Sequence, residues 1–545
     1  MKAYMFDALR ELIESIRCCL DGHEAETIET LRLVADGELE MVETLTPEEE
    51  VYAKALFGWI ASQGPKRVFK KLQPVLANPA HLLETEILLS TIIGDPGFAV
   101  IPPELKDPIN QRTTLRLAVL LMSYICYDQF HYPQPETGVY DISDNPFEKV
   151  KWVYRYWLNQ LEVAEEGSGL EAFFAAQSLT RLTRDAPAQD SDAMVPVFRT
   201  VSLSCAGDLL AVDVLTPKNT KHLFDDITDF YSTADIVSAN LESTVDEREF
   251  IGRYQAPGEP AQMNTSEEMF DKFRHDAKIN FFSTATNHAL DWGESGVHAT
   301  LDVLRRSGAR YSGTANSQAE QDDVVIVTEN GLKIALLCYT FDLNGHDPDA
   351  NKSYLANVVR FNDVDPDYSL IEQQVATAKA KGADWIIAYC HWGWEFEMYP
   401  HGNIVEAAHR VIECGVDTIL GNHAHVSQPA QLIPRPGKQD ALVIYAFGDF
   451  VSFHPDSRNS KLAFIIKFKI GKLFDEAYVY GIEALPIYIV NEKLGEDSYN
   501  CRIVKFAKVL ENPDHYGLTE LEKRQLPHLN HKVWGEILSP LSGLK

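Results

Sequence analysis

From residue 198 onward, short apolar segments alternate with amphipathic segments of helical period, and this alternation restricts the fold more than any other feature. Buried strands separated by helices are typical of an α/β domain whose sheets are covered on both faces. The helices expected between the strands span 217–231, 266–276, 294–307, 366–381 and 402–414. The expected strands span 198–206, 235–239, 279–285, 324–327, 333–339, 384–390, 416–420, 441–447 and 462–470.

Residues 1–184 show helical periodicity throughout and predict an all-α N-terminal domain. Thr46, followed by Pro47 and three glutamates, is typical of a helix start. This region has no cluster of His, Cys or paired acids, so we expect a scaffold that holds a protein partner or the substrate. Its further helices are expected at 66–78, 80–93, 113–128, 147–164 and 168–183.

Small and acidic residues with two prolines make up 185–196, which predicts a linker. A catalytic domain is then expected over 197–500, and residues 501–545 are expected to form a tail that packs on it. A chain of 545 residues has room for this many parts.

The net charge of −31 argues against nucleic acid and anionic membranes as partners, because both carry negative charge. The eight cysteines are scattered without a CxxC pair, which favours reduced thiols. No apolar run approaches the roughly 18 residues that span a bilayer, and the N-terminus lacks the apolar segment of a signal peptide. These features predict a soluble, cytoplasmic protein.

Side chains that commonly bind metals follow five of the expected strands. Ligands bind beyond the carboxyl ends of strands in open α/β sheets, so these side chains are expected to share one pocket. Oxygen and nitrogen ligands without cysteine suit Zn²⁺, Mn²⁺ or Fe, with one or two ions bound. The residues concerned are Asp208, Asn240, Glu242, Asn287, His288, Asp291, His391, Glu395, His423 and His425.

The ordered motifs GD, NLE, NHALDWG, HWGWE, GNHAHVSQ and YAFGDF resemble those of the CapA family of capsule biosynthesis proteins, part of the calcineurin-like metallophosphoesterase superfamily. The resemblance covers roughly residues 199–455. It implies a four-layer fold in which two sheets pack face to face between helices, with metals at the strand ends.

The resemblance also implies roles for individual residues. Asp208 and His425 resemble ligands of one metal, whereas Asn287, His391 and His423 resemble ligands of a second. Glu242 is placed to bridge both metals. His288 resembles the acid/base histidine of the superfamily, Asp291 is a candidate to orient it, and Glu395 is a candidate to contact a ligand or the substrate.

Three positions depart from the family pattern. Leu210 stands where the superfamily supplies a histidine, and Ala424 stands where relatives commonly have proline. Asp449 replaces an asparagine and is a candidate ligand, a partner of a ligand or a capping group. Five further histidines are single and unpartnered in the motifs and are expected to be structural or solvent-facing: His275, His298, His401, His409 and His454.

The first hypothesis for function is a metal-dependent hydrolase that cleaves a phosphoester or amide bond of a small-molecule or peptide substrate. The second is a peptide or amino-acid epimerase that uses the same residues to exchange an α-proton. The third is a non-catalytic biosynthesis or assembly partner that docks through the helical domain. Arg253 is the one cation near the motifs that is placed to bind a phosphate.

Overall fold

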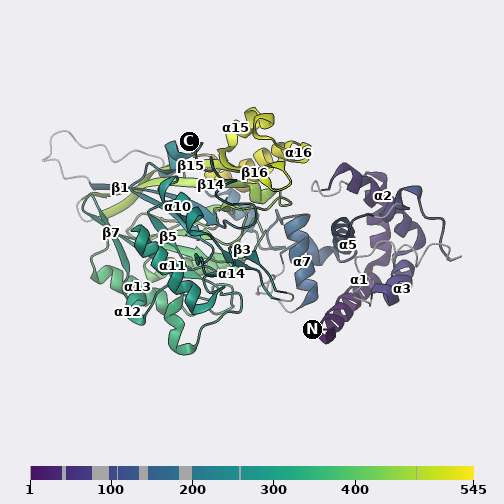
Figure 1. Cartoon of the computed structure of the whole chain (residues 1–545), viewed down its shortest axis with the longest axis horizontal. Coiled ribbons are helices and arrows are strands. Elements are labelled where there is room, and N and C mark those ends of the chain that lie inside the picture. The colour runs from purple at the N-terminus through teal and green to yellow at the C-terminus, as the bar shows by residue number, and fades with distance from the viewer. Residues whose placement is uncertain are drawn as a thin grey trace. The chain divides into compact units, whose positions relative to one another are not determined.

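The computed structural model describes residues 2–39, 45–76, 97–106, 109–133, 145–182, 199–256, 259–473 and 476–544 (Figure 1). The described residues form two compact units, the first ending at Leu161 and the second beginning at Glu162. The division therefore comes before the predicted boundary at residue 184. The predicted linker 185–196 and the predicted helix 80–93 lie outside the described residues.

The first unit is helical, as expected. The Thr46 hydroxyl accepts a hydrogen bond from the amide of Glu49, whose carboxylate accepts one from the amide of Thr46, so α2 begins with a complete capping box. Phe57 and Phe130 are fully buried in its core. Its elements are α1 (Lys2–Asp36), α2 (Pro47–Gln63), α3 (Pro65–Leu76), η1 (Pro103–Leu105), α5 (Gln111–Ile125), α6 (Tyr127–Phe130) and α7 (Pro146–Trp157).

The first sheet of the second unit has the strand order β16-β15-β14-β1-β2-β5-β6, with β13 pairing to β1. The strands β1, β2, β5 and β6 run parallel, and β13 is also parallel to β1. Their carboxyl ends therefore meet at one edge. The bounds are β1 (Arg199–Leu209), β2 (Ile236–Leu241), β5 (Phe281–Ser283), β6 (Arg310–Ser312), β13 (Asp449–Val451), β14 (Leu462–Leu473), β15 (Glu476–Gly495) and β16 (Ser498–Lys505).

The second sheet has the order β11-β12-β10-β9-β8-β7, and its strands β8, β9, β10 and β12 are parallel. It packs against the first sheet. The Tyr389 hydroxyl donates to Ser238 Oγ of the first sheet at 2.8 Å, and the rings of Tyr389 and Phe281 lie 5.2 Å apart. The bounds are β7 (Val325–Glu329), β8 (Leu332–Thr340), β9 (Trp385–His391), β10 (Thr418–Asn422), β11 (Ala430–Ile433) and β12 (Ala441–Ile444). A separate hairpin joins β3 (Gly252–Tyr254) and β4 (Gln262–Asn264).

Helices cover the outer faces of both sheets. Apolar residues of α10 (Glu267–His275) and α11 (Gly293–Ser307) share a core with β2 and β5. On the second sheet, α13 (Ser369–Ala380) is joined to β8 by a hydrogen bond from the Tyr339 hydroxyl to Gln374 Oε1, and α14 (Gly402–Cys414) to β11 by the pair Gln431 and His409. The four layers confirm the predicted fold class.

The segment predicted as a helix over 217–231 is helical only at α9 (Thr228–Tyr231). The carbonyls of Asn219 and Leu223 accept hydrogen bonds from Cys501 and Ile503 of β16, so they are not available for helix formation. Strand β16 also crosses the predicted boundary at residue 500. The remaining helices are short: α8 (Leu170–Ala175), η2 (Thr180–Leu182), α12 (Gln318–Asp322), η3 (Ala350–Leu355), η4 (Asn459–Lys461), α15 (Phe506–Glu511), η5 (Pro513–Tyr516), α16 (Glu520–His528), η6 (Leu529–Ile537) and α17 (Ser539–Ser542).

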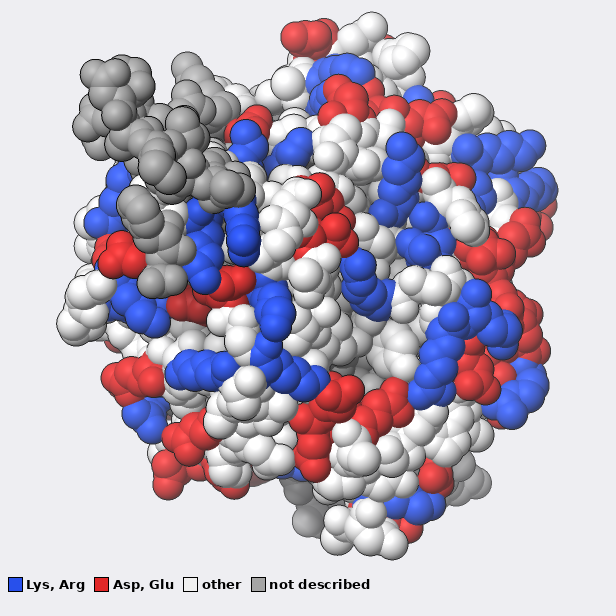
Figure 2. Space-filling model, turned by 90° about the vertical axis from the view of Figure 1, so that its left-hand side faces the viewer, with Lys and Arg blue, Asp and Glu red and all other residues white. Residues whose placement is uncertain are grey.

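One face of the molecule carries charged side chains of both signs (Figure 2). Figure 2 shows one face on which Lys and Arg are interspersed with Asp and Glu, so no continuous basic patch forms there.

None of the helices in the described part of the chain combines the length and the apolar character needed to cross a bilayer.

Candidate metal centre

Four strand ends bring acidic and histidine side chains into one buried cluster. Asp208 lies at the end of β1, Glu242 follows β2, His391 ends β9 and His423 follows β10. Each of these side chains belongs to a residue that is at most 2% exposed. The parallel strands of two facing sheets therefore deliver their terminal residues to the same place, as the sequence predicted.

Glu242, His391 and His423 offer three ligand atoms that lie within 4.8 Å of one another. The Nε2 atom of His391 is 3.3 Å from Glu242 Oε1 and 2.9 Å from Asn287 Oδ1. The rings of His391 and His423 are 4.8 Å apart. These four residues are therefore arranged so that one cation could contact all of them.

Asp208, Glu242 and His425 form a second such set, with the same limit of 4.8 Å. The His425 Nε2 atom lies 3.7 Å from Glu242 Oε1. Glu242 thus belongs to both sets, which is the position expected of a bridging carboxylate. All six predicted ligands lie together in the structure, and their binding of metal stays a prediction.

Asp449, a candidate from the sequence, and His454 extend the cluster beyond the six predicted ligands. Asp449 Oδ1 is 2.8 Å from His425 Nδ1, and Asp449 Oδ2 is 3.3 Å from His454 Nε2. The expectation that His454 is an isolated histidine was therefore wrong. His454 lies five residues after Asp449 in the sequence. This spacing alone does not identify it as part of the site, because the segment is brought to the cluster by the pairing of β13 with β1.

Crowding of buried charge shifts the protonation of this cluster. Burial, reinforced by the charge of Asp208, raises the pKa of Glu242 well above its ordinary value, and burial raises the pKa of Asp208 to about 7. Burial lowers the pKa of His391 and of His423 well below the ordinary value. Burial also acts to lower the pKa of His425, but the carboxylates of Glu242 and Asp449 outweigh it and raise that pKa.

The donor set fits a divalent cation. Both carboxylate oxygens of Glu242 and Nδ1 of His423 are buried without a hydrogen-bond partner, and a buried polar atom without a partner costs about 1–3 kcal/mol. Neutral imidazoles and carboxylates are the ligand forms that Zn²⁺ and Mn²⁺ accept. A cation would bond to the orphaned atoms and would favour the ionised carboxylates that burial now disfavours.

The backbone around the two histidines is strained. His423 and His425 have φ values of 94° and 53°, in the left-handed region that residues with a side chain rarely adopt. Such conformations cost about 1–3 kcal/mol each and are concentrated at functional sites. Gly421, two residues before His423, lies inside β10. A Cβ atom there would lie 2.0 Å from the Tyr445 carbonyl oxygen, so glycine is required by close packing.

His288 and Asp291 form a buried pair beside the cluster. The Asp291 Oδ2 atom accepts from His288 Nδ1 at 2.7 Å and from the amide of Met263 at 2.6 Å. The Asn344 amide nitrogen lies 3.5 Å from the same histidine nitrogen, and Asn344 Oδ1 accepts from Asn287 at 3.3 Å. Asp291 therefore lies where an orienting carboxylate was predicted, and the remaining nitrogen of His288 is Nε2.

Glu395 lies in the loop after β9, with Oε1 at 3.7 Å from His425 Nε2. The same loop carries His401, whose Nε2 lies 2.5 Å from Glu397 Oε2 and whose Nδ1 lies 3.2 Å from Glu165 Oε1. The expectation that His401 has no partner was therefore wrong. The ring of Trp394 stacks on that of His401 at 4.0 Å, so the loop is held from several sides.

Residues 162–182 contact the loop after β9, although they precede the predicted α/β region in the sequence. Besides contacting His401, Glu165 accepts a hydrogen bond from the amide of Gly402 at 2.9 Å. Phe174 packs on Tyr399 and Tyr445, with ring centroids 6.2 and 5.5 Å away. We call residues 162–182 the N-terminal arm. It belongs to the second unit and not to the helical scaffold to which it was assigned.

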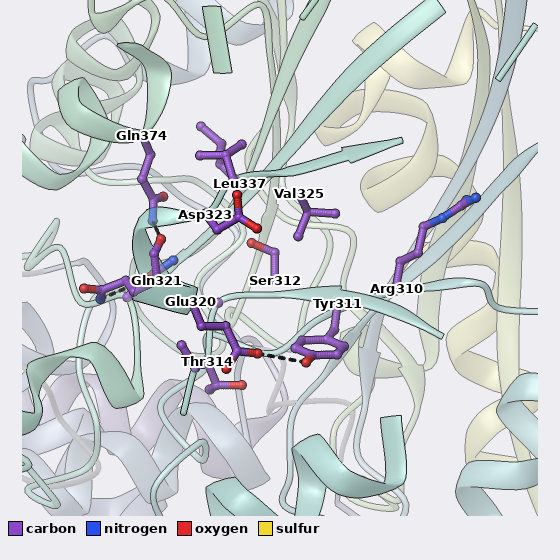
Figure 3. Close-up of a pocket in the computed structure, with 14 residues that line it drawn as sticks. Arg310, Tyr311, Ser312, Thr314, Glu320, Gln321, Asp323, Val325, Leu337 and Gln374 are labelled. Carbon is purple, nitrogen blue, oxygen red and sulfur yellow. Dashed lines mark hydrogen bonds between the residues drawn. The ribbon is translucent and has the colours of Figure 1, made fainter. Parts of the chain in front are cut away.

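A separate pocket of about 300 Å³ lies at β6 and contains none of the predicted site residues (Figure 3). Its polar groups bond to one another: the Tyr311 hydroxyl donates to Glu320 at 2.9 Å and the Gln374 amide donates to the Gln321 carbonyl at 2.9 Å. Because these groups already satisfy one another, we place the functional site at the strand ends.

Several proteins are similar to this chain. Residues 202–454 match the family model described as bacterial capsule synthesis protein PGA_cap. The capsule biosynthesis protein CapA of Bacillus anthracis is 23% identical over 278 residues, and the PGA biosynthesis protein CapA of Bacillus subtilis is 25% identical over 256 residues. These matches cover 48% and 46% of this chain, and the chain spans 63% of each of these relatives.

Among solved structures, the calcineurin-like phosphoesterase YfkN from Bacillus subtilis matches this chain with a TM-score of 0.31, 13% identity and coverage of 61% of this chain and 99% of that one. A hypothetical protein from Thermus thermophilus has a TM-score of 0.32 and 14% identity, with coverage of 52% and 99%. The family model covers the strands that carry the cluster, from Asp208 to His454. Over residues 202–454 the chain is therefore similar to the CapA proteins of bacterial capsule synthesis.

Proposed function

We propose that this protein is a metal-dependent hydrolase of phosphoester or amide bonds. The observation that supports it most directly is the shared, buried Glu242 carboxylate, which lies between two ligand sets and has no hydrogen-bond partner of its own. One cation would be held by Asp208, Glu242 and His425, and a second by Glu242, Asn287, His391 and His423. Cations bound here would lower the pKa of a coordinated water and neutralise charge on the group that is transferred.

The chain supplies the proton transfer. Asp291 accepts the Nδ1 proton of His288, which leaves Nε2 to give a proton to a leaving group or to take one from the substrate. The pair is buried, so the imidazole is held in one orientation. Glu395 is placed next to His425, where it can accept a hydrogen bond from water or substrate.

Metal content measured by inductively coupled plasma mass spectrometry tests the first part of the proposal. Wild type is expected to bind about two equivalents of Mn²⁺ or Zn²⁺, and Asp208→Ala and His423→Ala are each expected to bind less. Asp276→Asn, at an exposed position after α10, is the control. A wild-type protein that binds neither ion after reconstitution would refute the proposal.

Hydrolysis tests the second part. The reconstituted protein is expected to cleave bis(p-nitrophenyl) phosphate or a peptide amide, and His288→Ala is expected to retain its metal and lose about 10²–10⁴-fold in rate. The same peptides are incubated in D₂O. Deuterium at an α-carbon without cleavage would contradict hydrolysis and identify an epimerase that uses the same pair of residues.

A further inference from the structure

The β3–β4 hairpin contacts the proposed acid/base pair directly. The amide of Met263 in β4 donates to Asp291 Oδ2 at 2.6 Å, and the side chain of Gln262 donates to the Asp291 carbonyl. Arg253 of β3 is the cross-strand partner of Met263. Arg253 therefore lies on the strand next to Met263, whose amide binds Asp291. Asp291 in turn binds His288.

The guanidinium of Arg253 is only partly used by the protein. Its Nη2 atom lies 3.1 Å from Asp213 Oδ2, and its Nε atom is buried without a hydrogen-bond partner. A guanidinium has five N–H donors, so this contact leaves donors unused. The two side chains of the ion pair are 27% and 28% exposed, which makes the pair weak and easily rearranged.

Arg253 is also linked to the strand that carries Asp208, through its ion pair with Asp213. Asp213, the partner of Arg253, follows the strand that carries Asp208. The ion pair therefore ties the β3–β4 hairpin to the segment that follows β1.

Exposed apolar residues flank this arginine in the sequence. Phe250, Ile251 and Tyr254 are 56%, 37% and 44% exposed, although they lie within five residues of one another. The ring of Tyr254 is 6.0 Å from that of Trp292, the residue after Asp291. An apolar surface next to a cation lowers the local dielectric constant and strengthens its attraction for an anion.

Cations bound in the cluster would neutralise the charge of the group that is transferred. A second anionic group on the substrate would need a cation of the protein beside the cluster. Arg360 is the alternative arginine in the neighbouring loop, but it already pairs with Asp342 and Asp347 at 2.9 Å each. Arg253 is the arginine of the two that has a buried donor to spare.

We propose that Arg253 binds a carboxylate or phosphate group of the substrate next to the His288–Asp291 pair. This inference rests on the proposed function, because it names the class of substrate that the same site would receive. The substrate would carry its anionic group on the hairpin side of the bond that is cleaved, within reach of the guanidinium. The apolar side chains of residues 250–254 would cover the adjacent part of the substrate.

Binding of two simple anions tests the inference without any turnover. Inorganic phosphate and glutarate are titrated into the full chain by isothermal titration calorimetry, in metal-free protein and in protein loaded with Mn²⁺. Loss of a charge-assisted hydrogen bond weakens binding by about 10- to 100-fold, and we expect this for Arg253→Gln. Arg253→Lys is expected to recover part of the affinity, and Arg360→Gln to bind like wild type.

The tighter of the two anions identifies the chemistry of the recognised group. Equal affinity in wild type and Arg253→Gln, or equal losses in Arg253→Gln and Arg360→Gln, would overturn the assignment, as would the absence of binding by wild type at about 10 mM anion. Metal content and melting temperature are measured on the same samples. A protein that binds metal but shows no Arg253 effect would refute this inference and leave the proposed hydrolase standing, whereas failure to bind metal would refute the hydrolase.

Discussion

The Nδ1 atom of His425, in the loop after β10, lies 2.8 Å from the Oδ1 atom of Asp449, the first residue of β13, and both residues are buried. A carboxylate that accepts the Nδ1 proton fixes the imidazole tautomer and leaves its lone pair on Nε2. The Nε2 atom is the one directed toward Glu242. Of the three roles open for Asp449 in the sequence, the geometry favours that of a partner of a ligand.

We therefore expect Asp449→Asn to weaken metal binding by about 10- to 100-fold, because the amide can keep the hydrogen bond but not the charge. The affinity is measured by competition with a chromophoric chelator, and the visible spectrum of Co²⁺-loaded protein reports the ligand geometry. Asp276→Asn is the control. Unchanged affinity and an unchanged Co²⁺ spectrum in Asp449→Asn would show that Asp449 does not support His425.

Close packing at Gly421 predicts a large loss of stability in Gly421→Ala. The added Cβ would meet the Tyr445 backbone carbonyl at 2.0 Å, and backbone cannot move aside as a side chain can. Destabilisation of about 3 kcal/mol or more is expected in urea unfolding. At Gly495 the nearest atom would be Ser498 Cβ at 3.8 Å, so Gly495→Ala is expected to change stability by less than about 1 kcal/mol. Similar values for the two variants would contradict the close approach of the strands.

The His401 ion pairs predict a pH dependence of stability. Burial opposes the charged ring, but Glu397 and Glu165 raise the pKa of His401 to about 9 from an ordinary value of 6.5. The folded state therefore binds the proton more tightly, and this stabilisation is complete below pH 6.5 and is lost as the pH rises through 9. Its size is on the order of 3 kcal/mol.

His401→Gln lacks this titration and provides the comparison. The difference in free energy of unfolding between wild type and His401→Gln should shrink between about pH 6 and about pH 9.5. Tryptophan fluorescence during urea unfolding reports it, since Trp394 stacks on His401. A difference that stays constant over this range would mean that His401 is not protonated in the folded protein.

Two partly buried cysteines should react at different rates. A hydrogen bond from Cys126, with help from the charge of His23, lowers the pKa of Cys19 to about 7, whereas burial raises the pKa of Cys414. Alkylation requires the thiolate, so at about pH 7 Cys19 should react about tenfold faster than Cys414 or more. Peptide mass spectrometry during iodoacetamide treatment measures both rates in one sample. Cys126→Ala should slow Cys19, and equal rates in wild type would contradict the shift.

Much of the fold and the site follows from local pattern. Runs such as that before His391 are apolar on both faces, which identifies central strands, and the side chains after them point to the shared edge. The sequence alone therefore predicts one shared site for Asp208, Glu242 and His423. The second motif histidine, His425, joined them because it lies two residues further on.

The parts that the sequence did not predict depend on contacts between distant residues. His454 reaches the cluster because the preceding strand β13 pairs with β1. This strand has only three residues, and no local sequence pattern predicts its pairing. His401 is bound by Glu165, which lies far before it in the chain and outside the predicted catalytic domain. The segment 217–231 has apolar residues at helical spacing, yet its carbonyls bond to β16 instead.

The N-terminal arm has a practical consequence for anyone who shortens this protein. A recombinant fragment cut to the family match would begin at residue 202 and would lose Glu165 and Phe174, which contact His401 and Tyr445. Such a fragment is expected to aggregate, because an apolar surface would become accessible to other molecules and His401 would keep only one of its two carboxylate partners. The shortest autonomous piece should begin at Glu162, whose carboxylate binds Arg458, Asn459 and His528 and so ties the start of the second unit to its end.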